Sequence, residues 1–104
     1  MKLRIGHIKY KVIERKKPKL DDGTECAGLI DYYEHEILLM KSLSKEHKKK
    51  TLAHEIVHGL LHESGFESDD NDGIHTEDNV NRIGLTLHGF LKDNIEELYK
   101  LYKE

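Results

Sequence analysis

Two histidines at positions 54 and 58 constrain this chain more than any other feature of its sequence. They belong to the segment His-Glu-Ile-Val-His at residues 54–58, inside the stretch with the strongest helical pattern. A spacing of four residues places both side chains on one face of an α-helix, one turn apart and within about 40° of each other. Two imidazoles so placed can ligate one zinc ion, so the segment predicts a metal-binding helix.

The composition of this predicted helix supports the same interpretation. One arc, about 140° wide, holds both histidines and the polar or small residues Thr51, Glu55, Gly59 and His62. The opposite arc holds apolar residues, namely Leu52, Ala53, Ile56, Val57, Leu60 and Leu61. We therefore expect the helix to be anchored by its apolar arc and to present His54, Glu55 and His58 on the other.

Glu55 is the candidate catalytic residue of this helix. It points about 100° away from His54, so it is poorly placed to ligate the same ion. It is well placed to hold a water molecule on that ion and to accept its proton, which generates the nucleophile for peptide hydrolysis. A purely structural zinc site is disfavoured, because such sites are usually rich in cysteine and this chain has only Cys26.

A catalytic zinc site needs a third protein ligand from another segment. Glu77, in the first turn of the next predicted helix, is one candidate, and Asn81 lies on the same side, where it could support Glu77. His75 and Asp78 compete with Glu77 for this role. His62 is predicted to assist indirectly or to lie at the surface, because three histidines along one helix cannot converge on one ion without bending it.

The predicted elements place strands before helices, which indicates an α+β domain. Residues 3–13 predict one or two strands, with a hairpin near residues 6–7, and a loop follows over residues 14–25. A second hairpin is expected from strands at residues 29–32 and 36–39.

The helical part is expected to contain three helices. The first begins after Ser44 and ends near Glu63, and an acidic loop covers residues 66–76. Thr76 caps the second helix, and Asp93 starts a short third helix. The acidic pattern at residues 69–73 resembles a calcium loop, but the position that would need glutamate is an asparagine, so calcium binding is disfavoured.

Length and composition limit the remaining classes of protein. The 104 residues suffice for one small domain spanning residues 1–104, with no predicted membrane span or signal peptide. The single cysteine fits a reducing compartment, so we expect a cytoplasmic protein. Residues 1–20 carry eight Lys or Arg and one Glu, but the net charge is −3, so a nucleic-acid partner is not expected.

Residues 51–62 resemble the active-site helix of the ImmA/IrrE family of zinc metallopeptidases, which typically reads H-E-x-x-H-x-x-L-H. The family's next motif, roughly E-x-x-A-N-x-F-A, is matched at Glu77 and Asn81. The resemblance covers about residues 28–92 and is strongest to short, stand-alone members from phages and integrated elements of Gram-positive bacteria. It implies a zincin-like fold in which His54, His58 and Glu77 bind one zinc ion per chain.

The sequence and the resemblance together predict a zinc-dependent metallo-endopeptidase with Glu55 as general base. The resemblance further implies a protein substrate of the transcriptional-repressor class. The alternative is a zinc-binding module of the same fold that binds a partner protein with little or no turnover. A substrate strand would add to residues 29–32 or 36–39. Candidates for stabilising the oxyanion are Tyr32, Tyr33, His75 and His88.

Overall fold

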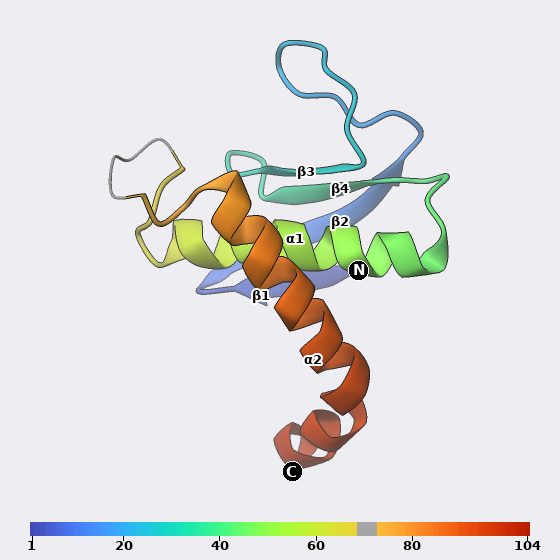
Figure 1. Ribbon diagram of the computed structural model, residues 1–104, viewed down its shortest axis with the longest axis vertical. Coiled ribbons are helices and arrows are strands. Elements are labelled where there is room, and N and C mark those ends of the chain that lie inside the picture. Colours follow the sequence, from blue (N-terminus) through green and yellow to red (C-terminus); the bar gives the residue numbers. More distant parts are fainter. Residues whose placement is uncertain (69–72) are drawn as a thin grey trace.

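A four-stranded mixed sheet comes first along the chain, and two helices follow it (Figure 1). The computed structural model describes residues 1–68 and 73–104. The expected α+β order is confirmed, and the architecture is that of a minimal zincin-like domain. The calcium-like pattern and part of the predicted acidic loop lie outside the described residues. No helix in the described part of the chain is both long and apolar enough to cross a membrane.

The sheet is built from two hairpins, as the sequence predicted. Strands β1 (Lys2–Ile5) and β2 (Ile8–Arg15) pair antiparallel, and the turn uses Gly6 with a φ of 62°. Strands β3 (Gly28–Asp31) and β4 (Glu36–Met40) form the second antiparallel pair. Parallel pairing of β2 with β4 joins the hairpins in the order β1-β2-β4-β3, which leaves β3 at an edge.

Helix α1 (Lys45–Glu63) covers one face of this sheet. The Ser44 side chain accepts a hydrogen bond from the backbone N–H of His47 at 3.2 Å, so the predicted N-cap is confirmed. The core beneath the helix consists of side chains that alternate along the strands, namely Ile5, Tyr10, Ile37 and Leu39. This period-two pattern fixes which face of the sheet receives α1.

Helix α2 (Glu77–Lys103) crosses over α1 on the side away from the sheet (Figure 1). Thr76 caps it as predicted, but the separate third helix is wrong, because α2 continues unbroken through Asp93. Gly89, one turn before Asp93, does not interrupt the helix, and no proline lies within it. The Asn94 side chain donates to the carbonyl of Phe90 within the helix. Asp93 and Glu96 therefore lie in the interior of α2, where Asp93 has no capping role.

Because α1 lies between the sheet and α2, the exposure of its side chains differs from the predicted polar and apolar arcs. Glu55, assigned to the polar arc, is buried with 5% of its surface exposed, whereas Leu60, assigned to the apolar arc, is 46% exposed. Covering a helix on two sides leaves no single solvent-facing arc. Glu55 consequently faces the sheet edge, and His54 and His58 face the start of α2.

Gly84 sets the distance between the two helices. A Cβ built on it would lie 3.2 Å from the Cα of His54, a backbone atom that cannot rotate away. We expect Gly84→Val to lower the free energy of unfolding by about 1–3 kcal/mol, as overpacking typically does. Gly89→Val is the matched control, because nothing lies within 4 Å of its Cβ position, and it should change stability by less than about 0.5 kcal/mol. Equal losses in urea unfolding would contradict this account.

Candidate metal centre

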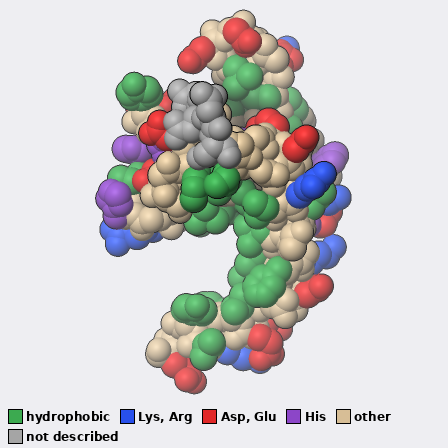
Figure 2. Space-filling model, turned by 60° about the vertical axis from the view of Figure 1, so that its left-hand side comes forward, with side chains coloured by type: hydrophobic (Ala, Val, Ile, Leu, Met, Phe, Trp, Pro, Cys, Tyr) green, Lys and Arg blue, Asp and Glu red, His purple; other side chains and the backbone are tan. Residues whose placement is uncertain are grey.

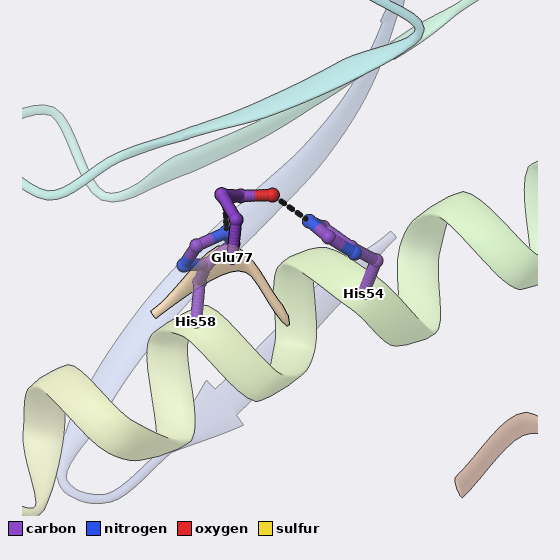
Figure 3. Close-up of side chains that lie close together, drawn as sticks. All are labelled: His54, His58 and Glu77. Carbon is purple, nitrogen blue, oxygen red and sulfur yellow. Dashed lines mark ion pairs between the residues drawn. The ribbon is translucent and has the colours of Figure 1, made fainter. Parts of the chain in front are cut away.

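Three side chains from two helices converge above the middle of α1 (Figure 3). His54 and His58 lie on successive turns of α1, and Glu77 reaches them from the first turn of α2. The Glu77 carboxylate lies 3.3 Å from His54 Nε2 and 2.7 Å from His58 Nε2. The structure thus brings together the three residues named from the sequence, while Asp78 is exposed outside this cluster.

The cluster fits a zinc ion. One ligand atom from each of the three residues lies within 4.8 Å of the others, and two ligands about 2.0–2.1 Å from a tetrahedral ion lie roughly 3.3 Å apart. Small side-chain movements would therefore suffice. Burial lowers the pKa of His58, which favours the neutral ring that a metal requires. Two imidazoles and one carboxylate form a donor set suited to zinc.

His75 is hydrogen-bonded to His58, one of the three residues of this cluster. It is buried, and its Nε2 lies 2.7 Å from His58 Nδ1, while its own Nδ1 is hydrogen-bonded to the Phe66 carbonyl. If Nδ1–H of each ring donates, His58 Nε2 is left free for a metal. His75 therefore acts on the orientation of His58, and the Phe66 carbonyl completes a chain that the sequence did not reveal.

Replacing His75 should weaken zinc binding without removing a ligand. We expect His75→Ala to reduce zinc affinity about 10- to 100-fold, because His58 loses the acceptor that fixes its ring. His75→Gln, whose amide oxygen can accept the same bond, should recover part of the loss. His62→Ala is the matched control, since His62 stacks on Tyr32 and lies outside the cluster. Competition with a zinc chelator measures all three, and an unchanged affinity in His75→Ala would refute the role.

Glu55 occupies a buried position beside the cluster. No described residue donates a hydrogen bond to its carboxylate, which lines a groove of about 390 Å³ with His54. Burial, and then the charge of Glu77, raises the pKa of Glu55 to about 8. An unpaired carboxyl with a raised pKa at the edge of a groove is suited to exchanging protons with a substrate or a water molecule.

The raised pKa of Glu55 predicts how the metal-free protein responds to pH. Its folded pKa lies above the ordinary value of 4.5, so the folded state binds this proton more tightly than the unfolded chain. Stability should therefore fall as the pH rises from about 4.5 through about 8, by up to about 1.4 kcal/mol per pH unit. In chelator, Glu55→Gln should lose less stability between pH 5.5 and pH 8 than wild type does. Identical urea-unfolding profiles would contradict this prediction.

The groove runs between the start of β3, α1 and α2. Six of the residues that line it are Ala27, Gly28, Thr51, Glu55, Asn81 and Gly84. A Cβ on Gly28 would meet Thr51 Cγ2 at 2.5 Å and Glu55 Oε2 at 3.5 Å, so glycine lets the edge strand approach the helix. The sequence analysis did not assign Gly28 a role, although a glycine at the start of a strand is a recognisable signal of close approach.

The other predicted site residues lie around the cluster or away from it. Asn81 lines the groove and forms no hydrogen bond to Glu77 among the described residues. His62 stacks on Tyr32, with 3.9 Å between ring centroids. Tyr33 is 96% exposed.

His88 and the two strands that were predicted to receive a substrate do not belong to the three-residue cluster. His88 bonds to Glu46 at 2.9 Å, outside the cluster. Of the two predicted docking strands, β3 is at an edge of the sheet and β4 is internal, between β2 and β3. An internal strand has no free backbone groups for a further strand, so the docking prediction is kept for β3 alone.

An α+β domain in which a His-Glu-x-x-His helix meets a glutamate from the next helix defines a metallopeptidase-type domain. Comparison with protein-family models places this chain more narrowly. The model of the IrrE N-terminal-like domain, Peptidase_M78, matches residues 12–84, and the chain belongs to this family. Searches of curated proteins and of solved structures gave no match.

Proposed function

We propose that this chain is a zinc-dependent metallo-endopeptidase that hydrolyses a protein substrate. The observation that carries the proposal is the convergence of His54, His58 and Glu77 beside the Glu55 carboxylate, which no described residue binds. Candidate ligands and a candidate base occupy separate positions and share one groove. A catalytic zinc site requires this separation, whereas a structural site has no use for a buried, unpaired carboxyl group.

Each residue then has a distinct task. His54, His58 and Glu77 hold one zinc ion per chain, which when bound polarises a carbonyl and lowers the pKa of water. Glu55 accepts a proton from the attacking water and returns it to the leaving amine. His75 keeps the ring of His58 in the orientation that leaves Nε2 for the metal.

The substrate in this proposal is an extended segment of a protein. Among the described strands, β3 pairs only with β4, so an extended peptide can add to its other edge by backbone hydrogen bonds. Gly28 at the start of β3 brings that edge close to Glu55. We propose a transcriptional repressor as the substrate, which the family resemblance implies. The corresponding location in this proposal is the cytoplasm of a bacterial host, with the chain encoded by a phage or an integrated element.

The proposal is tested by adding purified protein with one equivalent of zinc to a library of peptides derived from a bacterial proteome. Cleavage products identified by mass spectrometry should appear with zinc, disappear with a chelator and return when zinc is restored. Candidate repressors are assayed in the same way as intact proteins. A zinc-loaded protein that cleaves neither peptides nor repressors, yet binds a repressor tightly, would contradict the proposal and favour the partner-binding module.

A further inference from the structure

The groove beside the candidate metal centre continues along α1 toward the N-terminal end of that helix. The residues of α1 that line it are His47, Lys50, Thr51, His54 and Glu55. This spacing places them on one stripe of the helix. Measured from His54 along the helix axis, Lys50 lies about 6 Å away and His47 about 10 Å away. The groove therefore offers contacts to parts of a substrate that are remote from the cleaved bond.

The end of the groove farthest from the metal centre is positively charged. Lys50 and His47 are exposed there, and neither side chain forms an ion pair with a described residue. Lys48, by contrast, is paired with Glu14. The lining contributed by α2 and by the start of β3 is uncharged, namely Asn81, Gly84, Leu85, Ala27 and Gly28. Glu55 alone contributes a carboxylate to the described lining, and it is buried at the other end.

A second groove shows that this charge is a local feature. It lies on the projecting end of α2, where Figure 2 shows hydrophobic side chains, and it is lined by Ile95, Glu96, Leu98, Tyr99 and Tyr102. None of these lining residues is positively charged, and Ile95 is roughly 27 Å along α2 from Glu77. The unpaired cations instead line the groove that holds the candidate base.

Strand β3 and helix α1 run in the same direction beside the groove. At the start of β3, a Cβ on Gly28 would lie 2.5 Å from Thr51 Cγ2. Farther along both elements, a Cβ on Gly59 would lie 3.2 Å from Ile30 Cδ1. A peptide that pairs antiparallel with β3, which is the slightly more stable arrangement, runs opposite to both elements. Its C-terminal part then lies toward Thr51 and Lys50.

We propose that the groove selects substrates with an acidic side chain on the C-terminal side of the cleaved bond. Lys50 pairs with the carboxylate of that aspartate or glutamate, and His47 adds a second positive charge when it is protonated. An extended peptide advances about 3.3 Å per residue, so the 6–10 Å from His54 correspond to two or three residues. This inference rests on the proposed function, because it assigns a specificity to the same site.

Peptide binding to zinc-loaded Glu55→Gln tests the preference without requiring cleavage. The probe is a synthetic library of randomised decapeptides with amidated C-termini. Among the peptides retained, Asp and Glu should be enriched about two- to fivefold over Asn and Gln, as expected for a partly exposed ion pair. Adding Lys50→Glu should remove this enrichment or shift it to Lys and Arg. Adding Lys49→Glu, which makes the same charge change outside the groove, should leave it intact.

Matched substrates test the position of the acidic residue. A peptide cleaved by the zinc-loaded wild type is made again with Glu or Gln at each of the three positions on either side of the bond. The kcat/KM should be about two- to fivefold higher with Glu than with Gln at the second or third position after the bond. Positions before the bond should show no such difference. A preference found only before the bond would overturn the antiparallel direction.

The two experiments separate this inference from the proposed function. Zinc content measured for each variant shows that the domain remains folded. Cleavage without any acidic preference, or an equal loss of preference in the Lys50→Glu and Lys49→Glu variants, would overturn the inference and leave the peptidase intact. A preference that appears only for peptides with a free C-terminal carboxylate would assign the charge to a chain end and overturn it too. Acidic peptides retained but never cleaved would support the groove and contradict the peptidase.

Discussion

Glu55→Gln is expected to reduce zinc-dependent peptide hydrolysis about 10²- to 10⁴-fold while the zinc content stays unchanged. Glutamine keeps the size of the side chain but cannot accept a proton at neutral pH. Glu55 lies outside the three-residue cluster, so its substitution should not remove a metal ligand. The measurement is kcat/KM on a peptide identified in the cleavage screen, together with zinc per chain by mass spectrometry.

Glu63→Gln provides a matched control on the same helix. Glu63 accepts a hydrogen bond from the Tyr10 hydroxyl, and a glutamine oxygen can accept the same bond. It does not line the groove beside the metal centre, so hydrolysis should change by less than about threefold. If Glu55→Gln retains full activity with zinc bound, Glu55 is not the base. If both variants lose activity equally, the loss is not specific to the site.

Glu77→Ala is expected to weaken zinc binding by more than about 100-fold. Removing a ligand should cost more than the 10- to 100-fold typical of residues that only orient a ligand. Glu77 is the one member of the cluster that comes from α2, and its carboxylate lies close to both histidine Nε2 atoms. The measurement is zinc content after dialysis, followed by competition with a chelator of known affinity.

Asp78→Ala is the control for this substitution. Asp78 is the next acidic residue in the same helical turn, it is exposed, and it is not part of the cluster. Both variants lose one negative charge at the helix N-terminus, so any general effect of charge is shared. Zinc binding that is lost equally in both variants, or retained in both, would show that the third ligand lies elsewhere.

Local signals explain why much of the fold could be predicted. Ser44 and Thr76 are strong N-caps, and both helices begin where they indicate. The histidine spacing places His54 and His58 on one face, and the position of Glu77 in the first turn of α2 follows from the cap before it. These inferences need only the periodicity of an α-helix. That periodicity is a local property, because it relates residues that are close together in the sequence.

Contacts between distant segments explain what could not be predicted. Strands β2 and β4 pair in parallel although residues 16–35, which include β3, separate them along the chain, and no local pattern specifies this pairing. The burial of Glu55 follows from the close approach of β3, at Gly28, to α1, which a wheel drawn for one helix cannot include. The hydrogen bond between His58 and His75 likewise depends on where the chain returns after α1.

The three clustered residues come from two different helices, so a metal ion bound to them would affect the stability of the whole fold. His54 and His58 belong to α1, whereas Glu77 opens α2, so an ion bound between them would act as a cross-link that closes the loop joining the helices. Binding to the folded state alone stabilises it in proportion to the logarithm of free ligand concentration. Zinc supply would then control the lifetime of the protein against proteolysis as well as its chemistry.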